Sequence, residues 1–92
     1  MNKSIKKAES LLKILANQKR LLILCHLAEE KKSAGELSKL SNLSHSALSQ
    51  HLSKMKKLNL VKDCKEGREV FYSTKGYEVK AILSTLYLIY CK

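Results

Sequence analysis

The segment 33–60 combines two short helical patterns that are separated by a polar turn. The first begins at Ser33 and predicts a capping box with Glu36, because each side chain can satisfy a backbone N–H group that the first turn leaves unpaired. The second begins at Ser44, a suitable helix cap, and its apolar side chains recur at i, i+4 and i+7 as Leu48, Leu52 and Met55. Helix, turn and helix in this order predict a helix-turn-helix.

The opposite face of the second helix is predicted to be polar and free to contact DNA. Its side chains can bond to base edges or to phosphates. Gln50 is the main candidate for reading a base, since glutamine pairs with adenine and only two of the 18 basic residues are arginine, the usual reader of guanine. His51 is expected to pack or to touch a phosphate, and Lys57 to add affinity without specificity. The full predicted set on this helix is Ser44, His45, Ser46, Ser49, Gln50, His51, Ser53, Lys54 and Lys57.

Two further helices are predicted before this motif. Residues 4–16 place Ile5, Ala8, Leu12 and Leu15 on one helical stripe, and Asn17 can cap a second helix that continues to about Glu29. The middle of the second helix has little polar face, so we expect it at the centre of the core. Lys31 and Lys32 are assigned to the loop that follows.

A β-hairpin is predicted directly after the helix-turn-helix. Segments 60–65 and 68–73 hold β-branched and aromatic residues, and they are joined across Glu66 and Gly67. A hairpin in this position is a wing that reaches the DNA backbone or the minor groove. The alternative is a solvated hairpin whose charges only protect an edge strand. The charged residues that we expect near DNA are Lys62, Lys65 and Arg68.

The last predicted helix, residues 77–91, is apolar almost all round. Eleven of its fifteen residues are apolar, so no side of it suits water, and the simplest partner is the same helix of a second copy. The elements therefore predict a mainly α winged helix-turn-helix with a small β-hairpin, in the order α-α-α-α-β-β-α, that forms a homodimer through its first and last helices. Such a dimer presents two recognition helices about 34 to 36 Å apart, matching successive major grooves.

Length, charge and cysteine content agree with one small DNA-binding domain. The 92 residues contain no linker or repeat, so we expect residues 1–92 to form a single domain. The net charge of +10 favours double-stranded DNA through counterion release, although a merely soluble lysine-rich protein is the alternative. No apolar run reaches the ~18 residues of a membrane span, which predicts a cytoplasmic protein without membrane contact. Three cysteines without a CxxC pair predict free thiols.

Three stretches of the chain carry a resemblance to a known family: LANQKRLLILCHL, SAGELSKLSNLSHSALSQHLSKMKKLNLV and REVFYS. Together with the order of the elements, they resemble the ArsR/SmtB winged-helix regulators over nearly the whole chain. The resemblance is closest to the branch of HlyU-, BigR- and SqrR-type regulators. It implies a homodimer on imperfect inverted repeats at promoters, and a dithiol sensor at Cys25 and Cys91, which match the two cysteine positions of that branch.

The dithiol that the resemblance implies is a redox switch. We expect that a persulfide, a polysulfide or another oxidant converts one thiolate, that the second resolves it into a disulfide or sulfur-bridged link, and that the cross-link repositions the recognition helices. From the residues alone, a small core residue is the preferred interpretation of Cys25. Cys64, at the start of the wing, lies outside this pattern.

Metal sensing, the best-known activity of the parent family, has little support in the sequence. The first helix of the helix-turn-helix, SAGELSKL, lacks the cysteines of the usual Cys-x-Cys motif, and the last helix lacks the Asp and His of another site. We therefore expect no metal and no cofactor, and a metal-responsive repressor is a minor alternative.

Other interpretations concern what DNA binding does, or whether it occurs. The chain could be an activator that displaces a nucleoid silencing protein with little thiol dependence, or a repressor, or a dimerisation module without DNA. An enzyme is not expected, because no nucleophile elbow, phosphate loop or carboxylate pair is visible.

Overall fold

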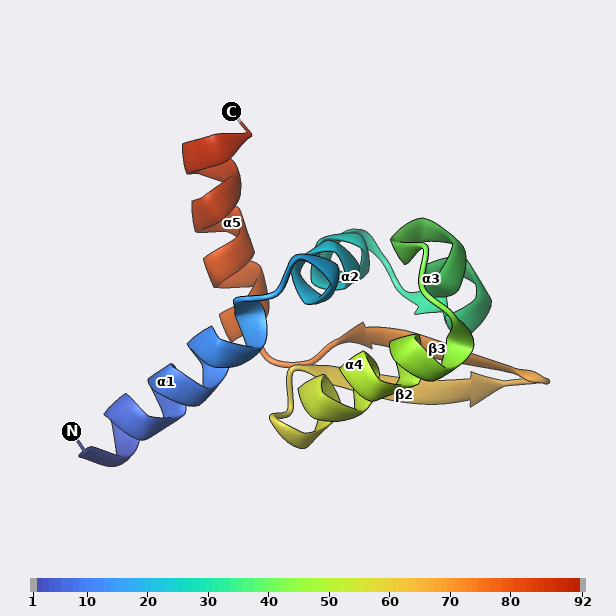
Figure 1. Cartoon of the computed structure of the whole chain (residues 1–92), viewed down its shortest axis with the longest axis horizontal. Coiled ribbons are helices and arrows are strands. Elements are labelled where there is room, and N and C mark those ends of the chain that lie inside the picture. Colours follow the sequence, from blue (N-terminus) through green and yellow to red (C-terminus); the bar gives the residue numbers. More distant parts are fainter. Residues whose placement is uncertain (1, 92) are drawn as a thin grey trace.

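The computed structural model describes residues 2–91 as five helices and three strands (Figure 1). This arrangement confirms the predicted winged helix-turn-helix, in which the third and fourth helices form the helix-turn-helix and the hairpin forms the wing. The elements are α1 (Asn2–Leu15), α2 (Gln18–Glu29), β1 (Lys32–Ser33), α3 (Ala34–Ser41), α4 (His45–Lys57), β2 (Val61–Glu66), β3 (Glu69–Thr74) and α5 (Glu78–Tyr90).

A short strand, β1, adds to the predicted hairpin and corrects the loop expected at Lys32. Lys32 pairs with Tyr72 and Ser33 with Phe71, both antiparallel, so the sheet has the order β1-β3-β2. A strand of two residues is too short to show the alternation by which strands are recognised in a sequence. Its partner lies far along the chain, so only the tertiary structure reveals it.

The turn of the wing lies one residue later than predicted. Glu66 is still part of the ladder and pairs with Glu69, so the turn residues are Gly67 and Arg68. Gly67 has φ 64°, which a type II′ turn requires at its first central position and which glycine adopts without steric cost. The shift places Arg68 at the tip of the wing.

Helix α2 passes through the middle of the core. It contacts α1, α3, α5 and β3, which confirms its predicted central position. One side of it is nevertheless open, since Leu22 and Cys25 are exposed. Five core residues are 0% exposed, and they come from four helices: Ile23, Leu24, Leu37, Met55 and Val79.

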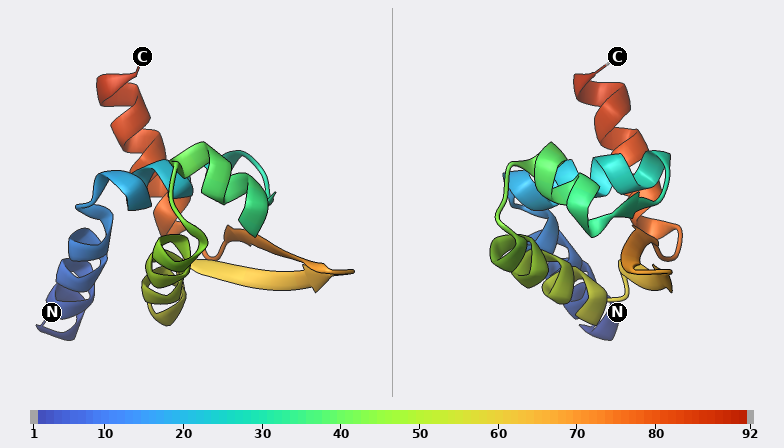
Figure 2. Two further views of the ribbon diagram at one scale, coloured as in Figure 1. Left: turned by 45° about the vertical axis from the view of Figure 1, so that its right-hand side comes forward. Right: turned by 90° about the vertical axis from the view of Figure 1, so that its right-hand side faces the viewer.

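Helices α1 and α5 leave the body on the side opposite the tip of the wing (Figures 1 and 2). The side of α1 that faces the core carries Leu11, Ile14 and Leu15, which differs from the predicted stripe in all but Leu15. Other apolar side chains of these two helices are exposed to solvent, with Leu88 and Ile89 both more than 60% exposed. The exposed apolar set comprises Ile5, Leu12, Tyr87, Leu88, Ile89 and Tyr90.

Candidate nucleic-acid interface

Helix α4 has one buried and one open face. Its apolar stripe lies in the core, where Leu48, Leu52 and Met55 are at most 3% exposed. The predicted division of this helix into a core face and a polar face is therefore confirmed. His51 is half-buried, whereas the other predicted contact residues of the helix are exposed: Ser44, His45, Ser46, Ser49, Gln50, Ser53, Lys54 and Lys57.

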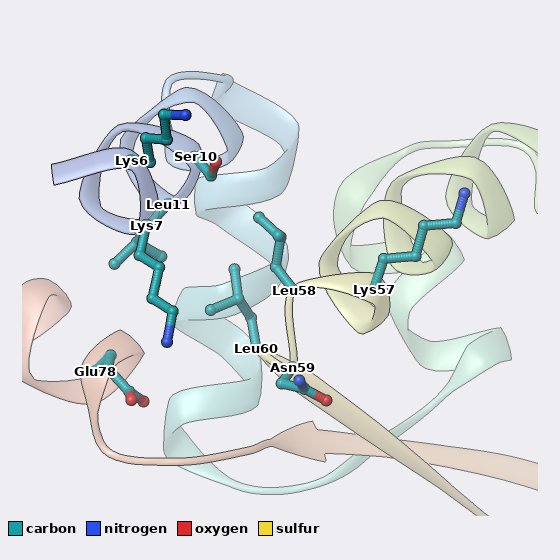
Figure 3. A pocket seen from close by; sticks show the side chains of 9 residues that line it. All are labelled: Lys6, Lys7, Ser10, Leu11, Lys57, Leu58, Asn59, Leu60 and Glu78. Carbon is teal, nitrogen blue, oxygen red and sulfur yellow. The ribbon is translucent and has the colours of Figure 1, made fainter. Parts of the chain in front are cut away.

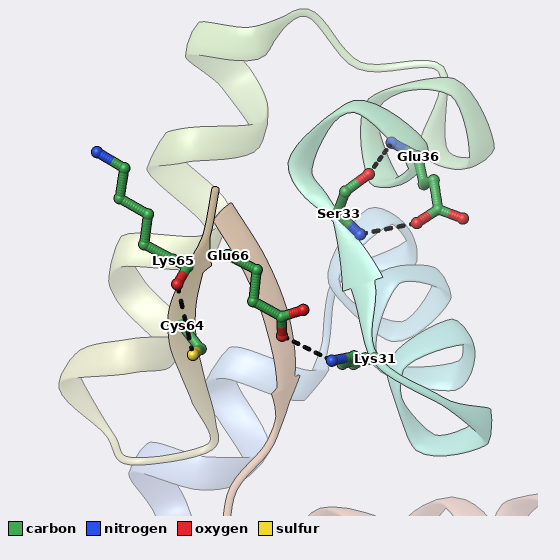
Figure 4. Close-up of polar contacts among 6 residues, drawn as sticks. All are labelled: Lys31, Ser33, Glu36, Cys64, Lys65 and Glu66. Carbon is green, nitrogen blue, oxygen red and sulfur yellow. Dashed lines mark hydrogen bonds and ion pairs between the residues drawn. The ribbon is translucent and has the colours of Figure 1, made fainter. Parts of the chain in front are cut away.

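Local hydrogen bonds fix both ends of α3. Ser33 Oγ accepts a bond from the Glu36 N–H (3.1 Å), and Glu36 Oε1 accepts one from the Ser33 N–H (2.9 Å) (Figure 4). The predicted capping box is thereby confirmed, and the bond from Ser33 lowers the pKa of the Glu36 carboxyl. At the other end Asn42 adopts φ 58°, and the N–H of Leu43 donates to the Ser38 carbonyl at 3.2 Å.

Caps also determine where α4 begins and ends. Ser44 Oγ accepts a hydrogen bond from the Ala47 N–H at 3.2 Å. After the helix Asn59 adopts φ 59°, and the N–H of Leu60 donates to the Met55 carbonyl at 3.0 Å, as in a Schellman motif. The recognition helix is therefore bounded by a serine and an asparagine, and the sequence alone predicts the serine as a helix cap.

Two ion pairs, which no local pattern in the sequence signals, connect the wing to the rest of the chain. Lys31 Nζ lies 2.6 Å from Glu66 Oε2 (Figure 4) and 5.2 Å from the centroid of the Phe71 ring. Lys56 Nζ, on α4, lies 2.8 Å from Asp63 Oδ2 on β2. The bond to Glu66 raises the pKa of Lys31, and the bond to Lys56 lowers the pKa of Asp63. Both pairs orient the wing relative to the recognition helix.

The wing carries its basic side chains on exposed positions. Lys62, Lys65 and Arg68 are all exposed, and the hairpin projects beyond the helices (Figure 2). Cys64 is also exposed there, and its Sγ lies 3.9 Å from the Lys65 carbonyl (Figure 4). Because β2 contacts α4, the lysines of the wing extend the basic surface of the recognition helix.

His51 is held by a residue from another helix. Its Nδ1 lies 3.3 Å from Nη1 of Arg20, at the start of α2. A guanidinium only donates, so Nδ1 accepts and the neutral ring carries its proton on Nε2. Burial lowers the pKa of His51, and the positive charges of Arg20 and Lys54 lower it further. The sequence gives no signal for this contact.

The two cysteines of the implied dithiol lie on helices that contact each other, α2 and α5. Cys25 is exposed, which corrects its interpretation as a core residue, and Cys91 follows the last turn of α5 and is exposed too. Neighbouring protein atoms partly desolvate the Cys25 thiol and raise its pKa, and the negative charges of Cys91 and Glu29 raise it further. Both thiols are accessible from solvent.

A half-open groove of about 510 Å³ lies between α1, the end of α4 and the start of α5 (Figure 3). Leu11, Leu58 and Leu60 form its apolar part. Its lysines, Lys6, Lys7 and Lys57, point in different directions rather than toward one point (Figure 3). The groove separates α1 from the C-terminal end of the recognition helix.

Residues 2–91 lack two kinds of feature. Over that part of the chain, no three His, Cys, Asp or Glu side chains are grouped as metal ligands. The described helices also include none with the length and apolar character that crossing a membrane demands.

Known proteins are similar in sequence to this chain over nearly its whole length. The bacterial regulatory protein family arsR matches residues 17–63, from the cap of α2 into β2. The transcriptional activator HlyU of Vibrio cholerae serotype O1 is 47% identical over 92 residues, which span 100% of this chain and 85% of that protein. The chain belongs to the arsR family. A second relative, the HTH-type transcriptional regulator YgaV of Escherichia coli K12, is 43% identical and covers 96% of this chain and 90% of its own length.

Solved structures extend this similarity over the whole fold. HlyU from Vibrio cholerae N16961 has a TM-score of 0.94 at 47% identity and covers 100% of both chains. The transcriptional repressor BigR from Xylella fastidiosa has a TM-score of 0.90 at 28% identity and covers 100% of this chain and 94% of its own. The resemblance to the HlyU and BigR branch is confirmed, and this arsR-family chain is a transcriptional regulator and not an enzyme.

We expect the stability of this regulator to fall at acidic pH through His51. The folded pKa of His51 is below its unfolded value of about 6.5, because burial, Arg20 and Lys54 all disfavour the charged ring. The contribution of His51 to the free energy of unfolding is therefore complete above its unfolded pKa. This contribution is lost as the pH falls through the lower folded pKa. Urea unfolding at a series of pH values from about 8 to about 5 should show that the free energy of unfolding falls more steeply for the wild type than for His51→Asn. Parallel curves would contradict this role of His51.

Proposed function

We propose that this arsR-family chain is a sequence-specific regulator that places α4 in the major groove of duplex DNA and its wing on the adjacent backbone or minor groove. The observation that carries the proposal is the polar face of α4, whose side chains are exposed and are not needed by the core. Gln50 and His45 would read base edges, and Lys57 would bind phosphate. The other proposed contacts are Ser44, Ser46, Ser49, His51, Ser53, Lys54, Lys65 and Arg68.

The charge of the chain supports a polyanionic partner. The net charge is +10, and Lys54 and Lys57 lie on the same helix as the proposed base readers. Lysines beside a reading face neutralise phosphates and release counterions, which gives affinity that depends on salt. Arg68, at the tip of the wing, is the proposed minor-groove contact, because a narrow A·T-rich groove attracts arginine.

We also propose that the regulator acts as a homodimer through α1 and α5, in the cytoplasm. Consecutive residues at the end of α5, from Tyr87 to Tyr90, are each at least 60% exposed, and α1 exposes Ile5 and Leu12. Water is a poor environment for so many neighbouring apolar side chains, and contiguous apolar patches mark interaction surfaces. A symmetric pairing would cover both helices and set two recognition helices side by side.

A thiol switch at Cys25 and Cys91 is the proposed trigger. One thiolate attacks a sulfur of hydrogen disulfide, HSSH, which forms a protein persulfide and releases hydrosulfide. The other thiolate then attacks the protein-bound sulfur, which forms the Cys25–Cys91 disulfide and releases a second hydrosulfide. Both cysteines are exposed, Cys25 on α2 and Cys91 directly after α5, and the contact between these two helices supports the pairing. This reaction should accelerate as the pH rises, because the thiolate is the nucleophile and the raised pKa of Cys25 keeps its thiol protonated to higher pH.

The direction of regulation is proposed to depend on the position of the binding site in the promoter. HlyU is named an activator and BigR a repressor, and both share this fold. The same protein surface can either block the polymerase or displace a silencing protein. The shared fold would supply the binding surface, and the position of the site would set whether transcription is activated or repressed.

The recognition helix is tested by two substitutions of different kind. Gln50→Ala should lower discrimination between a duplex selected by the wild type from a random library and an unrelated duplex, by about 1 to 3 kcal/mol. Lys57→Ala should weaken binding to both duplexes alike and reduce the salt slope by about one unit. Fluorescence anisotropy at several salt concentrations measures both effects. Equal binding of the wild type to selected and unrelated duplexes would sink the proposal.

The dimer is tested by a charge on the exposed end of α5. Ile89→Asp should give a monomer with native circular dichroism and much weaker binding to a duplex with two half-sites, because a buried aspartate at the interface is unpaired. Lys80→Asp, on the same helix at an exposed position that is already polar, is the control and should stay dimeric. Sedimentation equilibrium measures the oligomeric state of each protein. A wild type that is monomeric at micromolar concentration contradicts the proposal.

The thiol switch is tested by mass spectrometry of reduced protein before and after treatment with sodium polysulfide. The wild type and Cys64→Ser should gain a Cys25–Cys91 cross-link and change their DNA affinity, whereas Cys25→Ser and Cys91→Ser should do neither, since each lacks one partner. The cross-link should form faster at higher pH. An unchanged DNA affinity without that cross-link would rule the switch out.

A further inference from the structure

Side chains from the first turn of α2 contact three other helices. Asn17 Oδ1 accepts a hydrogen bond from the backbone N–H of Arg20 at 3.0 Å, which caps α2 and fixes its first turn. From that turn Lys19 Nζ donates to the carbonyl of Ser41 at 2.6 Å, at the end of α3. Two neighbouring cations of α2 therefore reach other helices, Lys19 the end of α3 and Arg20 the end of α1.

Arg20 makes two contacts that point in different directions. Its Nε donates to the carbonyl of Ile14 at 2.6 Å, in the last turn of α1, where backbone carbonyls lack partners within the helix. Its Nη1 donates to Nδ1 of His51 at 3.3 Å, on the recognition helix. One planar guanidinium thus bridges α1 and α4, which a lysine ammonium cannot do with the same fork geometry.

Apart from this bridge, α1 and α4 are held mainly by other elements. Helix α1 packs chiefly on α2, and α4 chiefly on α3 and β2. The groove of about 510 Å³ lies between α1 and the end of α4 (Figure 3). The angle between these helices is therefore sensitive to the few polar contacts that join them.

We propose that Arg20 is a positioning residue for DNA recognition, because its guanidinium joins α1, the proposed dimer helix, to His51 of the recognition helix. This inference rests on the proposed function. In a dimer, α1 would define the position of the two-fold axis, so the bridge would set how far apart the two recognition helices stand and hence the spacing of the half-sites. The same bond keeps the His51 proton on Nε2, where it can donate to a DNA phosphate.

The test separates positioning from simple affinity by varying the spacing of half-sites. A duplex selected by the wild-type protein from a random library is compared with versions that carry one or two extra base pairs at its centre, and with an unrelated duplex. The wild type should bind the selected duplex best and lose affinity sharply on insertion. Arg20→Met should bind the selected duplex roughly tenfold more weakly and respond little to the insertions.

Two substitutions of His51 form a matched pair. His51→Asn keeps an acceptor near the position of Nδ1 and should retain the spacing preference. His51→Gln places its amide nearer the position of Nε2, away from Arg20, and should lose that preference as Arg20→Met does. Because Arg20→Met already removes the contact to His51, Arg20→Met/His51→Gln should be no worse than Arg20→Met alone. Gln18→Ala, an exposed change in the same first turn of α2, is the control and should behave as the wild type.

The outcomes distinguish this inference from the proposed function. Retention of the wild-type spacing preference by His51→Gln would overturn the inference, and this variant decides alone if Arg20→Met does not fold by circular dichroism. A uniform loss of affinity for all duplexes would also overturn it, since that is the result of losing a phosphate contact or stability. Failure of the wild type to distinguish selected from unrelated duplexes would overturn the proposed function and the inference together.

Discussion

Burial of the apolar stripe of α4 is the interaction on which the rest of this structure depends. Leu48, Leu52 and Met55 lie in the core with Leu37 of α3 and the centre of α2, and this burial decides which side of α4 faces solvent. Because a helix has only one such orientation, the serines, Gln50 and the lysines are presented outward as a group. The caps at Ser44 and Asn59 then set the length of helix that is presented.

Apolar burial alone does not place that helix accurately, because the hydrophobic effect has no direction. Directed polar contacts complete the positioning: Lys56 joins α4 to β2, Lys31 joins the wing to the end of α2, and Arg20 joins α4 to α1. None of these contacts lies deep in the core. They are the contacts through which small changes elsewhere in the molecule could alter the DNA-binding surface.

Helices α1, α2 and α5 carry the features that the single chain leaves exposed, namely the apolar side chains of α1 and α5 and the thiols of Cys25 and Cys91. Cys91 ends α5, and Cys25 lies on the open side of α2, the helix whose first turn holds Arg20. A small domain buries a modest fraction of its apolar surface, so pairing with a second copy and control by a cross-link both act on helices that the single chain leaves incompletely packed. Sensing and reading would then be connected through α2.

Local rules in the sequence were enough to predict the helices, their caps and the division of α4 into a buried and a polar face. Ser33 with Glu36, Ser44 and Asn59 act within one helical turn, and Leu48, Leu52 and Met55 reveal their common face by spacing alone. The wing was predicted by the same means, apart from a shift of its turn by one residue to Gly67 and Arg68. The strand β1, the ion pairs of Lys31 and Lys56, the exposure of Cys25 and the Arg20–His51 bond were decided only by the tertiary structure. Each of these depends on residues that are distant along the chain and are brought together by packing, which no periodicity or local propensity records.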